Sequence, residues 1–289
     1  MAEPQAPRLD QRSPPGAGRP GRGGRPLVAI AYLAALALGL PVAGLVIRAV
    51  ADGSLGIALG TRVVIDALVL SLVTTAASLV LTVTFGTPLA LALARRRFRG
   101  SSIVETVVDL PIVLPPSVAG LALLLLLGRR GVLGGAFEAF GIELPFTTAA
   151  VVIAQTFVSA PFYIRSARAG FAGVDRDLED AARTDGATES QLFRAITVPL
   201  AGAALAAGLV MCWARSLGEF GATIMFAGSL QRVTQTLPLA IYAEFARSFD
   251  VALAIGALLV AFSFFLLLAV KWLHFGWISP LRFATSSSA

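Results

Sequence analysis

The sequence predicts an all-α membrane protein: a polytopic bundle of about six transmembrane helices from which a polar helix–turn–helix protrudes. Hydrophobic residues make up 56% of the 289 residues and charged residues only 14%, whereas a soluble domain carries about 25% charged residues. Six apolar runs are long enough to cross a bilayer, which takes about 20 residues. One long polar stretch, residues 173–199, separates two of these runs.

Residues 1–26 are expected to form a disordered tail. They are rich in Pro, Gly and Arg and contain almost no bulky apolar side chains, so they cannot bury enough surface to fold. The first apolar run covers residues 27–47. It exceeds the apolar part of a cleaved signal peptide, about 7–15 residues, so we expect a retained anchor. This anchor and a short amphipathic link make up the region 27–66.

The main transmembrane domain is expected over residues 67–271, followed by a C-terminal tail over residues 272–289. Its spans are predicted at residues 67–94, 107–127, 146–164, 200–220 and 251–270. The second of these five is predicted to be broken, because Pro111, Pro115 and Pro116 interrupt backbone hydrogen bonding.

The polar stretch 173–199, called the polar loop below, is predicted to begin with a short helix. Asp175 can cap this helix, and Gly186 can end it in a left-handed turn. Its first turns carry the acidic residues Asp177, Glu179 and Asp180, where the helix dipole favours them. The apolar residues that share one side at helical spacing are Val174, Leu178, Ala181 and Ala182.

A second helix of the polar loop is predicted to start at Thr188. Its hydroxyl and the Gln191 side chain have the spacing of a capping box. Leu192, Phe193 and Ile196 give this helix an apolar face, and Pro199 marks the next boundary. The polar loop is therefore interpreted as a docking surface. The alternative is an amphipathic hairpin that rests on the membrane surface.

The basic residues predict the orientation in the membrane. Sixteen of the 23 Lys and Arg residues fall in the N-terminal tail, in the segment 95–106, in the segment 165–194, and at the C-terminal end. The positive-inside rule places these segments and both termini in the cytoplasm. Because the basic residues flank apolar runs and are not interleaved with aromatic residues, lipid headgroups explain the net charge of +6 better than nucleic acid does.

The sequence lacks the residue patterns that are usual for ATP binding, catalysis or metal binding. A P-loop needs Gly-Lys-Ser/Thr, and the one lysine, Lys271, lies between Val270 and Trp272. The single His274 and the single Cys212 provide neither a catalytic cluster nor a metal site. We therefore expect no enzyme activity, no metal and no bound cofactor. A membrane-embedded enzyme and a structural or receptor protein remain the alternative classes.

A motif in the polar loop resembles the EAA loop of type I ATP-binding-cassette (ABC) importer permeases. The matching residues are Asp180, Ala181, Ala182, Gly186, Ile196 and Pro199. The chain departs from the pattern at two positions: Asp180 replaces Glu, and Val198 replaces the Leu before Pro199. The resemblance implies that these six residues couple the permease to a separate cytoplasmic ABC ATPase, which uses ATP and Mg.

Three further segments, residues 110–120, 215–228 and 234–242, resemble molybdate permeases, and the whole resemblance covers residues 67–271. It implies an importer subunit in the bacterial inner membrane, a homodimer, and an extracytoplasmic molybdate-binding protein as partner. The sulfate branch of the same superfamily has a similar layout, so sulfate and tungstate stay open as substrates.

Four residues near the end of the span 200–220 are candidates for the translocation path or gate: Arg215, Ser216, Glu219 and Thr223. Arg215 and Glu219 are four positions apart, which predicts a pair on one helix face. Ionisable groups within spans often mark a pathway or gate. The alternative is that this pair lies near the outer headgroups and only packs the bundle.

Overall fold

The computed structural model describes residues 24–95 and 98–278, and all regular elements in these ranges are helices. Residues 1–23 of the predicted N-terminal tail therefore lie outside the described part of the chain. The C-terminal residues from position 279 on, Arg282 among them, also lie outside it. The C-terminal tail expected from position 272 does not begin there, because the last helix continues to Ile278. The side chains of Lys271 and His274 also lie outside the described part.

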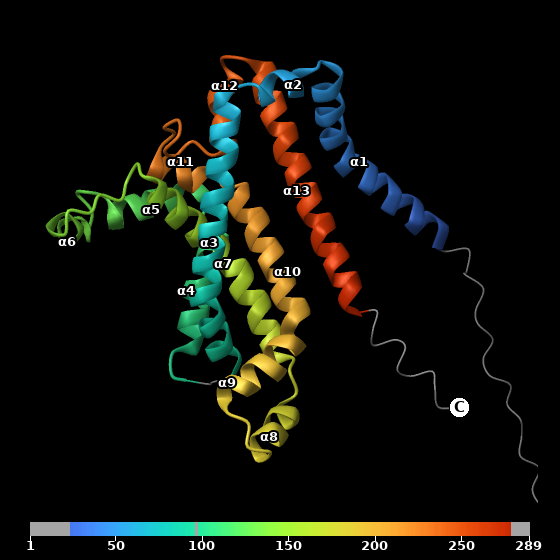
Figure 1. The fold of residues 1–289 in the computed structure, drawn as a ribbon, viewed down its shortest axis with the longest axis vertical. Coiled ribbons are helices and arrows are strands. Elements are labelled where there is room, and N and C mark those ends of the chain that lie inside the picture. The colour runs from blue at the N-terminus through green and yellow to red at the C-terminus, as the bar shows by residue number, and fades with distance from the viewer. Residues whose placement is uncertain (1–23, 96–97, 279–289) are drawn as a thin grey trace, which may run out of the picture. The chain divides into compact units, whose positions relative to one another are not determined.

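The chain divides into two compact units, residues 1–44 and 45–289. The described part of the first unit is the start of α1 (Gly24–Ala51), an apolar helix that contains Pro41. The helices of the second unit are α2 (Ser54–Leu59), α3 (Arg62–Arg95), α4 (Ser101–Val113), α5 (Pro116–Leu127), α6 (Gly134–Ala139), α7 (Thr148–Ala172), α8 (Arg176–Thr184), α9 (Glu189–Leu192), the π-helix η1 (Phe193–Thr197), α10 (Val198–Leu217), α11 (Gly221–Ala227), α12 (Leu237–Phe245) and α13 (Phe249–Ile278) (Figure 1).

Three helical segments of the described chain are long and apolar enough to span a membrane: residues 27–51, 62–95 and 189–217. The pair formed by α4 and α5 would make a fourth as a broken span. The side chains of α13 are described without a gap over Phe249–Phe265, and this stretch is apolar but shorter than these segments. The polytopic helical fold is thus confirmed, whereas the number of six spans stays a prediction.

The predicted break is confirmed at Pro115 and Pro116, between α4 and α5, whereas Pro111 lies inside α4 and does not interrupt it. Leu114 is extended, with ψ 134°, and Pro116 occupies the first turn of α5, where a missing N–H leaves no helical hydrogen bond unmade. The two helices bend by 118° at this point. As a result α5 packs against α11 and α7, around a core that includes Ala119, Leu123 and Phe226.

The centre of the second unit is formed by α3, α7 and α10, which pack along one another. Small residues allow this packing: a Cβ atom on Gly170 of α7 would lie 2.7 Å from the Cβ of Ala204 in α10. A Cβ atom on Gly208 of α10 would likewise lie 2.8 Å from the Cβ of Ser166 in α7. Close approach through small residues is typical of membrane helices.

The fourth predicted span is longer than expected, because α7 continues eight residues past position 164 to Ala172. The last turns of α7 form two ion pairs with α4. Arg168 contacts Glu105 at 2.8 Å, and Arg165 contacts Asp109 at 3.5 Å. The charged last turns of α7 therefore have partners on a neighbouring helix.

Gly120 in α5 provides a test of the packing at the break. A Cβ there would lie 2.5 Å from the carbonyl oxygen of Ala222 and 2.8 Å from its Cα, both in the backbone of α11. Gly120→Ala is expected to destabilise the protein by about 1–3 kcal/mol, the usual cost of overpacking. Thermal unfolding in detergent measures the effect. Gly202→Ala, at a helical glycine with open space around its Cβ position, is the control, and equal melting temperatures for both variants would contradict the packing.

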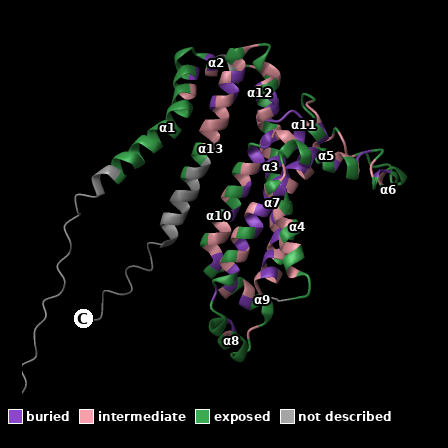
Figure 2. Ribbon diagram, turned by 180° about the vertical axis from the view of Figure 1, so that it is seen from behind, coloured by how far each residue is buried: buried purple, intermediate pink, exposed green. Residues whose placement is uncertain are grey.

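The polar loop lies at one end of the second unit. Figure 1 shows α8 and α9 at this end and α2 and α12 at the opposite one. Figure 2 shows α8 as a mainly exposed helix, in contrast to the buried stretches of α7. The end of α3 and the start of α4 come close to the polar loop, since Arg95, Ser101 and Arg176 line one cavity.

Candidate functional site

The first helix of the polar loop forms as the sequence predicts. The Asp175 carboxylate caps α8 by accepting a hydrogen bond from the backbone N–H of Asp177, at 3.0 Å. At the other end Gly186 has φ 88°, the left-handed conformation that glycine adopts at low cost. The amide of Ala187 then donates to the carbonyl of Ala182 at 3.0 Å, so the turn satisfies a carbonyl that the helix end leaves open.

The second helix begins with the predicted capping box. The backbone N–H of Gln191 donates to the Thr188 hydroxyl, and the Gln191 side chain accepts from the Thr188 backbone at 2.9 Å. Only α9, residues Glu189–Leu192, is an α-helix here, and it passes directly into the π-helix η1.

The prediction that Pro199 marks a helix boundary is wrong. Pro199 lies in the first turn of α10, and the helical chain runs without a break from α9 through η1 into α10. Proline in a helix clashes with the carbonyl four residues earlier, here that of Ala195. The π-helix covers that position and widens the turn; the amide of Val198 donates to the carbonyl of Phe193, five residues back. The wider turn provides the room that the proline ring needs.

Removing the cap of α9 tests the start of the second helix. Thr188→Ala is expected to weaken α9 by about 1 kcal/mol, because one N–H group loses its acceptor. Amide hydrogen exchange at Gln191 and Leu192 should then accelerate by about fivefold. Ser190→Ala, at an exposed position of the same helix, should leave the exchange unchanged, and equal rates in the two variants would argue against the cap.

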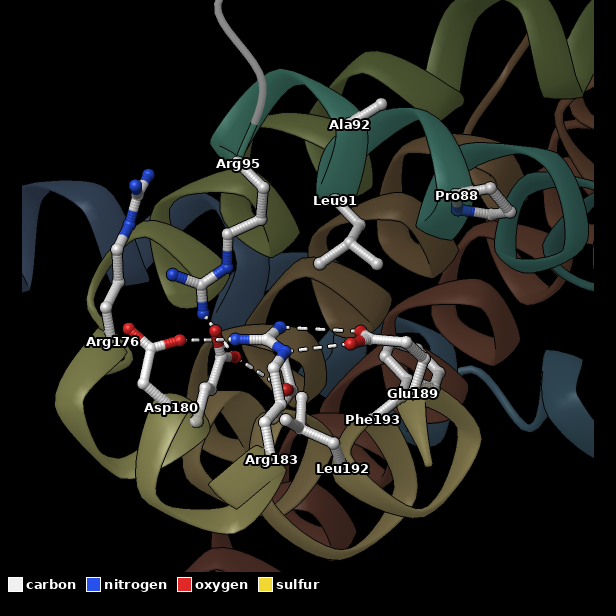
Figure 3. Close-up of a pocket in the computed structure, with 12 residues that line it drawn as sticks. Pro88, Leu91, Ala92, Arg95, Arg176, Asp180, Arg183, Glu189, Leu192 and Phe193 are labelled. Atoms are coloured by element: carbon white, nitrogen blue, oxygen red, sulfur yellow. Dashed lines mark hydrogen bonds and ion pairs between the residues drawn. The ribbon is translucent and has the colours of Figure 1, made fainter. Parts of the chain in front are cut away.

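Arg183 clamps the two helices of the polar loop together. Its Nη1 donates to Oδ1 of Asp180 at 2.6 Å, and its Nε donates to Oε1 of Glu189 at 2.8 Å. Figure 3 shows the guanidinium between these two carboxylates, one from α8 and one from α9. The hydrogen bond to Glu189, and next the one to Asp180, raise the pKa of Arg183 above its ordinary value. The clamp is solvent-exposed, so it shapes the turn more than it adds stability.

The motif residues are distributed over this framework. Asp180, Ala181 and Ala182 lie in α8, Gly186 in the turn, Ile196 in η1 and Pro199 in α10. The side of α8 that carries Leu178 and Ala181 faces solvent, and Leu178 is 51% exposed. Burial of an exposed leucine on such a charged helix would favour association with another surface.

Glu179 is the residue whose role the sequence reasoning missed. Its side chain is only 6% exposed and accepts hydrogen bonds from Arg95 of α3 and Thr197 of η1, both at 2.7 Å. A favourable interaction with the helix dipole is expected equally for Glu179 and Asp177, so it does not indicate which of the two is buried. The sequence did contain one indication. Glu179 lies five residues after Val174 and three before Ala182, and the side chains at these two positions turn toward the inside of the protein.

A cavity of about 560 Å³ opens between the end of α3 and the polar loop. Figure 3 shows Pro88, Leu91 and Arg95 on one side of it and Asp180, Arg183 and Phe193 on the other. Apolar side chains from α3, α9 and η1 form part of the lining, with charged groups around them. The cavity therefore combines a hydrophobic surface with both signs of charge.

The predicted pair of Arg215 and Glu219 is present. Arg215 Nη1 lies 2.5 Å from Glu219 Oε2, and the Arg215 side chain is 28% exposed while that of Glu219 is 1% exposed. Glu219 Oε1 also accepts from the backbone N–H of Ala222 at 2.7 Å. The carboxylate thus connects the end of α10 to the start of α11.

Ser216 and Thr223 lie beside this pair in the sequence and are fully buried within the chain. Neither hydroxyl oxygen has a hydrogen-bond partner in the described part of the chain. The structure therefore brings Arg215 to a partly open position and encloses the other three candidates. In the described residues, no group of three or more His, Cys, Asp or Glu side chains comes together in a way that could hold a metal ion.

The family model for the binding-protein-dependent transport system inner membrane component matches residues 86–278. The chain belongs to this family. Its matched region begins inside α3 and contains the polar loop, the Arg215–Glu219 pair and all helices from α4 to α13.

Curated relatives of this family member include molybdenum transport permeases. The Molybdenum transport system permease protein ModB of Mycobacterium tuberculosis is 47% identical over 204 residues, which cover 71% of this chain and 77% of the relative. The ModB protein of Escherichia coli is 40% identical over 178 residues, which cover 61% of this chain and 78% of the relative.

Solved structures of ABC transporters share the fold. A bacterial ABC transporter involved in the import of the acidic polysaccharide alginate matches with a TM-score of 0.67 at 18% identity, over 86% of this chain and 94% of the other. The MetNI methionine ABC transporter in an inward-facing conformation matches with a TM-score of 0.53 at 17% identity, over 73% and 93%. The permease fold predicted for this family member is thereby confirmed.

Proposed function

We propose that this chain is the permease subunit of an ATP-driven importer that carries an oxyanion, molybdate, across the bacterial inner membrane. The observation that carries this proposal is the 47% identity to a molybdenum transport permease over 204 residues. The resemblance of residues 110–120, 215–228 and 234–242 to molybdate permeases agrees with it. Under this proposal both termini and the polar loop lie in the cytoplasm, as the distribution of basic residues favours.

The polar loop is proposed as the docking site of the cytoplasmic ABC ATPase. Its exposed face with Leu178 and Ala181, and the neighbouring cavity of about 560 Å³, offer apolar surface within a charged rim. Such a combination suits a specific protein contact, in which the apolar centre gives affinity and the rim gives orientation. ATP and Mg are bound by that partner.

The remaining partners are proposed from the same family. Two copies of the chain form a homodimer around a shared path, and an extracytoplasmic binding protein delivers molybdate to its outer mouth. Closure of two ATPase subunits on ATP would draw the two polar loops together and open the path outward. ATP hydrolysis would then release the loops and open the path inward.

The proposal is tested by reconstituting the chain with its ATPase and binding protein in proteoliposomes. Molybdate, tungstate and sulfate are offered separately, and molybdate uptake that requires ATP is the expected result. Sulfate uptake without molybdate uptake would overturn the substrate. Failure of any ATPase to co-purify with the chain would instead favour a structural or receptor protein.

A further inference from the structure

Glu179 is a buried carboxylate on an otherwise exposed helix. The neighbouring acidic residues of α8, Asp177 and Asp180, are both exposed, whereas the Glu179 side chain is 6% exposed. A buried carboxylate is costly unless it is paired and hydrogen-bonded. Its Oε1 meets this requirement by accepting from Arg95 and Thr197, each at 2.7 Å.

These contacts join α8 to α3, where Arg95 is 84 positions from Glu179, and to η1, where Thr197 is 18 positions from it. Arg95 is the last residue of α3, the 34-residue helix of the central bundle, and Thr197 ends η1 immediately before α10. Arg95 also reaches the start of the polar loop, where its Nη1 lies 3.4 Å from the carbonyl oxygen of Val174. One carboxylate therefore connects α8 to α3 and to η1, the turn that leads directly into α10.

The other ion pairs of the polar loop in the described part of the chain stay within the loop. Arg183 binds Asp180 and Glu189, which are themselves part of the loop. That clamp fixes the shape of the turn without attaching it to a long helix. Among the hydrogen bonds and ion pairs found in the described residues, α8 reaches α3 and η1 through Glu179.

We propose that the Arg95–Glu179–Thr197 contact is the link through which movement of the polar loop is carried into α3 and α10, with Glu179 as a positioning residue. This inference rests on the proposed function, because it assigns the link to the step between ATP hydrolysis and opening of the path. A partner that displaces α8 must move the ends of α3 and α10 with it, since separating them would strand a charged group in a buried position.

The first test needs neither substrate nor partner. Amide hydrogen exchange is measured on the full chain in detergent for Glu179→Gln, which keeps the size of the side chain and removes its charge. Exchange in α8 should rise by at least about tenfold, as expected for loss of a charge-assisted hydrogen bond. Asp177→Asn, an exposed carboxylate of the same helix, is the matched control and should not change the exchange. Unchanged exchange in the Glu179 variant would overturn the link.

The second test measures transport in the reconstituted complex as molybdate moved per ATP hydrolysed. Glu179→Gln and Arg95→Gln should each lower this ratio while binding of the ATPase is retained, and their combination should be no worse than either alone. Arg95→Lys, which retains a positive donor, should restore part of the ratio. If the variants lose ATPase binding as much as they lose the transport ratio, and if Arg95→Lys restores neither, then the contact only maintains the structure of the loop. That result would overturn the proposal.

The two tests separate this inference from the proposed function. A wild-type complex that transports no oxyanion, with exchange in α8 raised by Glu179→Gln, would refute the proposed function and leave the link intact. A wild-type complex that transports molybdate, with the ratio unchanged in the Glu179 and Arg95 variants, would refute the link alone.

Discussion

Arg215→Gln is expected to produce a folded but less stable permease with slow oxyanion uptake. The change leaves the carboxylate of Glu219, which is 1% exposed, without its positive partner at 2.5 Å. Breaking a fully buried pair costs about 3–5 kcal/mol, and the partial exposure of Arg215 lowers this to about 2 kcal/mol. Uptake should fall as well, because Arg215 provides positive potential for a dianion close to the mouth of the proposed path. ATPase binding should be unaffected, since Arg215 lies in the last turn of α10, about 25 Å along the helix from η1.

The partner variant and a control sharpen this result. Glu219→Gln should disturb gating, and the double variant should be non-additive, because both changes remove the same contact. Arg48→Gln breaks an exposed pair of the same spacing, Arg48–Asp52, and should change neither melting temperature nor uptake. Additive effects at 215 and 219 would show that the pair does not act as a unit.

Gly186→Val is expected to lower ATPase binding about fivefold or more while the chain still inserts into the membrane. A Cβ at this position meets no atom within 4 Å, so the side chain itself has space. The strain comes from the backbone: φ is 88°, and a β-branched residue there costs about 1 kcal/mol or more. The turn would open and separate α8 from α9. Co-purification of the ATPase and ATP-dependent uptake measure the effect.

Gly186→Asn is the matched control for this change. Asn tolerates the left-handed region better than other residues with a side chain, so this variant should keep most of the binding. Normal uptake by the Val variant would show that the conformation of the turn does not matter for coupling.

The features that the sequence predicts correctly are local ones. Asp175, Gly186 and the Thr188–Gln191 box lie within a few residues of the groups that they satisfy, and each occupies its expected place. The Arg215–Glu219 pair is also local, because its residues are four positions apart, although Glu219 lies beyond the end of α10 and not on the predicted shared helix face. The break before Pro116 follows from proline chemistry alone, although its angle of 118° does not.

Two of the features that it misses depend on distant residues, and a third depends on an unusual local turn. Arg95 and Glu179 are 84 positions apart, so no spacing rule connects them. Pro199 is interpreted as a boundary because the rule for proline assumes an α-helix, and the wider turn of η1 removes the clash. The added length of α7 accompanies ion pairs with α4 that become visible only when the two helices are side by side.

The π-helix η1 also sets the direction in which the polar loop faces. One residue of an α-helix turns the chain by about 100°, and a π-turn contains one residue more than an α-turn. The part of the polar loop before Phe193, which includes α8, is therefore rotated by about 100° about the helix axis, compared with the position that it would have if the same residues formed an unbroken α-helix. A related chain with one residue fewer between 193 and 197 and an unbroken α-helix there would aim an identical α8 surface in the same direction, because the wider turn of η1 absorbs the extra residue. The heading of the proposed docking face is thus decided by the length of one helical turn.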